Sequence, residues 1–205
     1  EDLHLIYYYI IVVTIFFLFF SFKNDFLINL LSLSSSMSNT GFSLNYDQSN
    51  LNFVYLILVI IGGSFFSTSS GLRFIKIYSL FKYSINQILS FSRPKNIFMN
   101  KLLFTEINFD FKEISKYFLT IIIFIISLFI LTILLSLSSI DFESAFKLSV
   151  LTLMNTVNST AYGLSNFDFY NLNYFTKYCL ILFMIIGRIE LLTILIIIKN
   201  FLFKD

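Results

Sequence analysis

The sequence is poor in charge, cysteine and histidine. Only 13% of its 205 residues are charged, whereas soluble domains average about 25%. A lone cysteine, Cys179, excludes an internal disulfide, and no cluster of His, Cys and carboxylate residues fits a metal centre. The lone histidine, His4, has no serine nucleophile to activate. We therefore expect no enzymatic activity, no cofactor and no nucleic-acid partner.

Apolar residues are in excess instead. They make up 57% of the chain, and the mean hydropathy is +0.83. Several apolar runs approach the roughly 20 residues that a helix needs to cross a bilayer. This composition predicts an all-α polytopic protein whose surroundings are the lipid bilayer. We expect a multi-pass protein of the cell membrane, meaning the plasma or inner membrane.

The apolar runs form two copies of one pattern: a span, a short helix, a polar turn and a second span. Each short segment, at 1.5 Å per residue, covers only about half of the hydrocarbon core, so we expect it to enter the membrane and turn back. An internal repeat in a membrane protein indicates a path at the repeat interface. The expected spans are 3–22, a broken span that starts over 51–61 and resumes from residue 72, 117–137 and 175–203, and the expected short helices are 26–35 and 142–154.

These runs divide the chain into a pore repeat over residues 1–83, a linker over 84–116 and a second pore repeat over 117–205. From Arg73 to Lys116 there are eight basic residues and three acidic ones. Short basic loops stay on the cytoplasmic side. The linker is thus predicted to be cytoplasmic, and both polar turns are predicted to open from the outside.

The two polar turns are rich in oxygen atoms. Thr40-Gly41-Phe42 lines up with Thr160-Ala161-Tyr162. Backbone carbonyls in such turns can replace the water shell of a cation, and each preceding helix points its partially negative C-terminus at the turn. The alternative is an ordinary helix-to-loop turn. The predicted filter residues are Ser38, Asn39, Thr40, Gly41, Phe42, Asn158, Ser159, Thr160, Ala161 and Tyr162.

Two further features indicate a gate. The stretch Gly62–Gly71 interrupts a span with three Gly and four Ser, and irregular backbone at membrane depth must be buried in protein or line a cavity. Arg188, near the middle of the last span, is costly in lipid and is expected to face the protein interior. The alternatives are close helix packing for the first and a structural tether for the second. The predicted gating residues are Gly62, Gly63, Ser64, Ser69, Ser70, Gly71 and Arg188.

In this order and spacing, the motifs resemble those of the Trk/Ktr/HKT superfamily of potassium transporters, over nearly the whole chain. Residues 62–73 are similar to that family's Gly- and Ser-rich broken helix, and Gly187-Arg188-Ile189-Glu190 is similar to its Gly-Arg-Leu-Glu. The resemblance implies that Ser38–Phe42 and Ser159–Tyr162 each supply a quarter of a potassium filter through backbone carbonyls. It also implies that residues 62–71 form an intramembrane gating loop, which Arg188 contacts.

The resemblance carries further expectations about assembly. Family members have four such repeats around one pore, and the two found here correspond to the third and fourth, so two preceding repeats are implied. A homodimer and a cytoplasmic ring of nucleotide-binding regulatory subunits are implied as well. Ala161 stands where the fourth filter usually has Gly. Since a left-handed Ala costs about 1–2 kcal/mol, either the backbone differs there or Gly163 takes over the turn.

The leading hypothesis is uptake of potassium, or another monovalent cation, through a filter of backbone carbonyls gated by an intramembrane loop. The alternative is a non-transporting fragment, a decayed half of such a transporter or a membrane scaffold, because the sequence starts without Met and holds two repeats. A tandem two-span potassium channel is a third option. It predicts a Thr-Val-Gly-Tyr-Gly filter, which neither turn has.

Overall fold

The computed structural model describes residues 2–20, 26–42, 51–61, 72, 74–92, 111–158, 160–164, 169–170, 172–188 and 200. Over these residues the chain is helical throughout and has no strand, which confirms the expected all-helical fold. The elements are α1 (Asp2–Phe20), α2 (Phe26–Met37), α3 (Asn52–Ile61), α4 (Phe74–Ser92), α5 (Phe111–Ser136), α6 (Phe142–Met154), the 3₁₀ helix η1 (Thr160–Tyr162) and α7 (Tyr174–Arg188).

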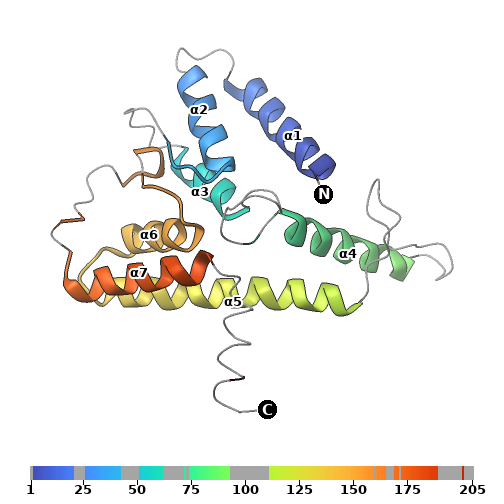
Figure 1. Ribbon diagram of the computed structural model, residues 1–205. Helices are drawn as coiled ribbons and strands as arrows, with labels where there is room; N and C mark the ends of the chain where they lie inside the picture. The colour runs from blue at the N-terminus through green and yellow to red at the C-terminus, as the bar shows by residue number, and fades with distance from the viewer. Residues whose placement is uncertain are drawn as a thin grey trace.

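The longest helix, α5, forms the base of the molecule. In Figure 1, α6 and α7 lie along its C-terminal half and α4 lies along its N-terminal half. The hairpin of α1 and α2 stands apart from this base, and α3 contacts both α2 and α6. The two short helices, α2 and α6, are therefore joined through α3.

The packing of α5 follows its apolar spacing. Phe124, Leu128, Leu131 and Leu135 recur at intervals of three and four residues, which places them on one helix face, and all four are buried. This face packs against α6 and α7, where Leu153 is also fully buried. The apolar stripe of α5 thus fixes the second short helix in place.

Helix surfaces that face away from the core are apolar too, in α1 as well as in α5. Within the described residues, Glu113–Ser136 of α5 is the one stretch both long and apolar enough to cross a membrane by length and composition. Helix α1 exposes large apolar side chains, and a soluble protein rarely leaves a contiguous surface of this kind uncovered. The exposed apolar side chains of α1 are Ile6, Tyr7, Ile10, Ile11, Val13, Ile15, Phe17, Leu18 and Phe19.

The helix bounds agree closely with the sequence in the two short helices. Helix α6 has the expected bounds, Asp141 occupies its N-cap position without a side-chain cap bond, and α2 extends to Met37. Both expected linker boundaries fall inside helices, because α4 continues to Ser92 and α5 begins at Phe111. The expected break over residues 62–71 and the last part of the final span, beyond residue 188 except for residue 200, lie outside the described residues.

Helix α7 crosses the end of α6 at a glycine. A β-carbon added to Gly187 would lie 2.3 Å from the carbonyl oxygen of Leu153, which is helix backbone and cannot swing aside. One turn earlier in α7, the carbonyl of Met184 accepts a hydrogen bond of 3.0 Å from the side-chain amide of Asn155. A glycine is required here because the two backbones touch.

We expect Gly187→Ala to lower the free energy of unfolding by about 1–3 kcal/mol, because overpacking must push α7 away from α6. The measurement is thermal or denaturant unfolding of the protein in detergent micelles. Ile185→Ala on the same helix is the control. Its side chain is 58% exposed, so its effect should stay within about 0.5 kcal/mol. Equal losses for both variants would contradict the contact.

Candidate functional site

The first polar turn begins where α2 closes on a left-handed residue. Asn39 has a φ of 56°. Its N–H donates to the carbonyl of Ser36 at 3.3 Å, and the N–H of Thr40 donates to the carbonyl of Ser35 at 3.1 Å. This pair of bonds is the Schellman arrangement, in which the last carbonyls of a helix find donors after the chain has turned. The turn therefore leaves α2 with these two carbonyls satisfied.

The second polar turn begins in the same way. Asn155 ends α6 with a φ of 51°. Its N–H donates to the carbonyl of Thr152 at 3.2 Å, and the N–H of Thr156 donates to the carbonyl of Leu151 at 3.0 Å. Both bonds span the same numbers of residues as those at the end of α2. The two short helices therefore end with the same backbone geometry.

When the ends of α2 and α6 are aligned by these hydrogen bonds, Asn155-Thr156 corresponds to Asn39-Thr40. The sequence motifs instead pair Thr40 with Thr160, which lies four residues further along. That pairing rests on the shared Thr-small-aromatic letters, whereas the backbone follows the left-handed residue that closes each helix. Sequence reasoning therefore missed Thr156, although the Asn-Thr pair that follows each short helix was a signal that could have found it.

The two turns are in contact. Gly41 is buried and has a φ of 76°. A β-carbon at this position would lie 2.1 Å from the carbonyl oxygen of Val157, so the first turn meets the backbone of the second. A side-chain hydrogen bond also joins Tyr162 to Ser36 in the last turn of α2. The structure thus brings the two predicted filter segments together.

The hydroxyl groups in and around the first turn make hydrogen bonds with one another and with backbone carbonyls. The Thr40 hydroxyl lies 3.0 Å from that of Ser35 and 3.2 Å from that of Ser38. The hydroxyl of Ser36 donates to the carbonyl of Ser32 at 2.7 Å. From α1, the hydroxyl of Tyr9 donates to the carbonyl of Met37 at 3.1 Å. These bonds give the first turn a fixed shape.

Two oxygen atoms of the second turn have no hydrogen-bond partner within the part of the chain that the structure describes. They are the hydroxyl of Thr156, a residue only 6% exposed, and the side-chain oxygen of Asn158, and both atoms are buried. The amide nitrogen of Asn158 is used, since it donates to the carbonyl of Leu164 at 3.5 Å. Burying an unpaired polar group costs about 1–3 kcal/mol. Oxygen atoms held in this way are suited to a hard cation or to a water molecule.

Beyond these oxygen atoms the second turn continues into η1. Ala161 lies within η1 and does not have a positive φ, whereas Gly163 has a φ of 73°. The left-handed residue of this turn is therefore Gly163, and Ala161 avoids the cost of that conformation. A β-carbon there would lie 2.4 Å from the amide nitrogen of Asn52 and 3.1 Å from the amine of Lys147. Ser159 lies outside the described residues.

The predicted gating residues are tested less directly. Gly62, Gly63, Ser64, Ser69, Ser70 and Gly71 lie outside the described residues. Arg188 is at the end of α7 and is exposed, contrary to the expectation that it faces the interior of this chain. The gating role of these residues stays a prediction.

Ionisable groups near the turns pair with each other. At the start of α6, a hydrogen bond from Lys147 to Glu143 holds the pKa of the Glu143 carboxyl below its ordinary value. Among the described residues, no three His, Cys, Asp or Glu side chains gather in a way that could hold a metal ion. The residues of the two turns, 38–42 and 155–162, offer backbone, hydroxyl and amide oxygens and include no carboxylate.

Residues 21–203 match the model of the TrkH family, described as cation transport protein. No curated protein matches the sequence. Among solved structures, the crystal structure of the potassium transporter TrkH from Vibrio parahaemolyticus aligns with a TM-score of 0.74 at 20% identity. The alignment covers 91% of this chain but 41% of that one, so this likeness shows the fold, and the chain spans less than half of that protein's length.

We expect Gly41→Ala to disrupt the contact between the two turns. A left-handed Ala costs about 1–2 kcal/mol, and the clash with the Val157 carbonyl adds to this cost because a backbone atom cannot rotate away. Thermal unfolding in detergent should show a lower midpoint. Val157→Ala is the control, since it removes a side chain that is 65% exposed and keeps the carbonyl. A Gly41→Ala protein as stable as the control would show that the turns do not touch.

Proposed function

This chain belongs to the TrkH family of cation transport proteins, and we propose that its two polar turns line part of a potassium path across the membrane. Proteins of this family are membrane transporters and not enzymes. We propose that the two turns supply half of a four-part filter, and that two further repeats supply the other half. The proposal places the protein in the plasma or inner membrane.

One observation carries the proposal: two half-length helices end in the same left-handed turn, and the turns touch at Gly41 and Val157. A single turn of this kind is an ordinary helix end. Two of them, joined at their tips and reached by helices too short to span a bilayer, place irregular backbone at membrane depth. Such backbone is tolerated only where protein buries it or where it lines a water-filled cavity.

The chemistry of the turns suits a dehydrated monovalent cation. Potassium gives up its water shell only if protein oxygens replace it. In the proposal, backbone carbonyls of Ser38–Phe42 and of Asn155–Tyr162 supply these oxygens. The unpaired side-chain oxygens of Thr156 and Asn158 support this assignment, because they are buried and available. The C-terminal ends of α2 and α6 add partial negative charge at the same place.

Passage through the filter needs a gate. We assign this role to residues 62–71, which come after α3, together with Arg188 at the end of α7. Both segments continue from helices that contact a short helix, α3 with α2 and α7 with α6. Movement of the gating segments can therefore be transmitted to the turns through backbone that is already packed against them.

The direct test is uptake of potassium or rubidium. The full protein, expressed as its gene encodes it in cells that lack their own potassium uptake systems, should restore growth at low potassium and take up rubidium. Cells carrying the empty vector are the control, and membrane levels of the protein are measured in parallel. If the protein reaches the membrane and carries neither ion, the proposed function is wrong.

A second test uses Thr156→Val, which removes the buried hydroxyl and preserves the shape of the side chain. Because an unpaired hydroxyl weakens the fold, the variant should be at least as stable as the original protein. If the hydroxyl serves the ion path, rubidium uptake at low concentration should fall by about tenfold, equal to roughly 1.4 kcal/mol of lost ion stabilisation.

Thr160→Val is the matched control for this experiment. It makes the same change at the position that the sequence motifs pair with Thr40. A larger loss of uptake at Thr156 would support the pairing of the helix ends. A larger loss of uptake for Thr160→Val would support the sequence-based pairing of Thr40 with Thr160 and would contradict the role proposed for Thr156.

A further inference from the structure

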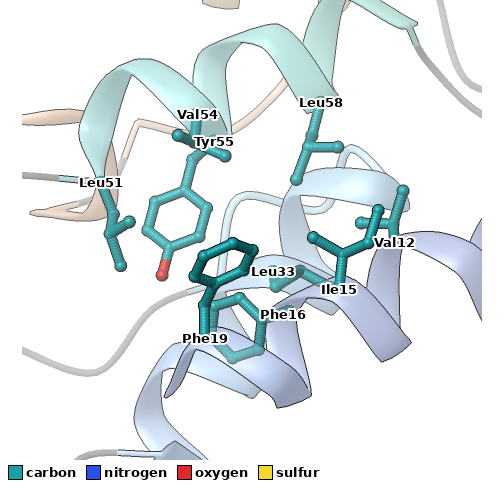
Figure 2. A pocket seen from close by; sticks show the side chains of 9 residues that line it. All are labelled: Val12, Ile15, Phe16, Phe19, Leu33, Leu51, Val54, Tyr55 and Leu58. Carbon is teal, nitrogen blue, oxygen red and sulfur yellow. The ribbon is translucent and has the colours of Figure 1, made fainter.

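A cavity of about 190 Å³ lies between α1, α2 and α3 (Figure 2). Side chains from all three helices converge on it, with the ring of Tyr55 at one side and those of Phe16 and Phe19 across from it. Its walls are formed by Val12, Ile15, Phe16, Phe19, Leu33, Leu51, Val54, Tyr55 and Leu58.

The lining offers nothing to a polar guest. The one polar group among these side chains is the Tyr55 hydroxyl, which donates to the carbonyl of Asn29 at 3.5 Å. A water molecule needs two to four polar partners, and an apolar cavity of about 150 Å³ lined by Leu, Ile and Phe stays dry and binds benzene. A cavity of this size and lining therefore takes an apolar guest somewhat larger than benzene.

The cavity is open at one side. Its floor is buried, since Phe16, Leu33 and Leu58 are at most 7% exposed. Its rim is formed by Ile15, Phe19 and Val54, which are 50%, 74% and 45% exposed. A guest can therefore enter from the surface without unfolding any helix.

The apolar surface around the opening indicates which kind of molecule occupies the cavity. Ile15 and Phe19 belong both to the rim and to the exposed apolar side of α1, so the cavity is continuous with that side. In a membrane transporter, an exposed apolar helix surface is the interface with lipid tails. The apolar stretch of α1, Ile6–Phe19, is about 21 Å long and can follow the lipid tails over most of the hydrocarbon core. Lipid tails are therefore the apolar groups present at the opening.

We propose that a phospholipid acyl chain occupies this cavity and completes the packing between α1 and α2. The site would hold several methylene groups of one chain, with the head group outside at the membrane surface. It matters for the filter because α2 carries the first turn. Tyr9, on the same helix as Val12 and Phe16, holds the carbonyl of Met37 at the end of α2, so an acyl chain that seats α1 against α2 also steadies this bond.

The proposal is tested with a phospholipid that carries a diazirine on its acyl chain, incorporated into nanodiscs with the purified full protein. After illumination, mass spectrometry should find the label on the peptides that contain Val12–Phe19 and Val54–Leu58. Val12→Phe fills the cavity and should reduce this labelling severalfold. Val13→Phe makes the same change at the next residue, which does not line the cavity, and should leave the labelling unchanged.

A measurement on the unmodified protein gives a second test that does not depend on how Val12→Phe folds. A diazirine near the methyl end of the acyl chain should label the floor residues Phe16, Leu33 and Leu58, and one near the head group should not. Uniform labelling along the exposed side of α1 would overturn the proposal. Absence of label in the cavity would also overturn it, because another segment of the full protein would then be the occupant.

Discussion

The fold depends on how two short helices, α2 and α6, end. A helix leaves its last carbonyls without partners, and lipid offers them no donors. Both α2 and α6 meet this constraint with an asparagine in the left-handed conformation, which turns the chain so that the N–H of the asparagine and the N–H of the next residue reach back to the helix. At the end of α6 the backbone makes these bonds, and the side-chain oxygens of Thr156 and Asn158, further along the second turn, have no hydrogen-bond partner within the described part of the chain.

The two turns begin alike and then diverge. In the first, Thr40 is tied to Ser35 and Ser38, and Gly41 lets the backbone approach its neighbour. In the second, the side chains of Thr156 and Asn158 keep oxygens unpaired. The first turn is therefore rigid and satisfied, whereas the second carries a cost that only a bound ion or water relieves. The asymmetry suits a filter assembled from non-identical segments around one axis.

The sequence predicted the helices better than the turns, for a physical reason. Apolar run length and spacing decide where a helix crosses or enters a bilayer, and they placed α6 with its observed bounds. The position of a turn depends instead on which residue adopts the left-handed conformation, and Asn39 and Asn155 are common residues that give little signal in isolation. The shared letters pair Thr40 with Thr160, whereas the hydrogen bonds at the two helix ends pair it with Thr156. The contact between Gly41 and Val157 joins residues 116 positions apart, and no local pattern encodes it.

The two short helices are equivalent in sequence order but are not supported equally. Helices of 12 and 13 residues are marginal alone and need tertiary packing. Every residue from Leu148 to Met154 of α6 is buried, among α3, α5 and α7. Helix α2 packs mainly against α3, and its contact with α1, the counterpart of α5 in the chain order, is less extensive and borders the apolar cavity. Its end is held by the Tyr9 hydroxyl, the Tyr162 bond and the contact at Gly41. The first turn therefore owes its position to a few specific contacts, and the second owes its position to general burial.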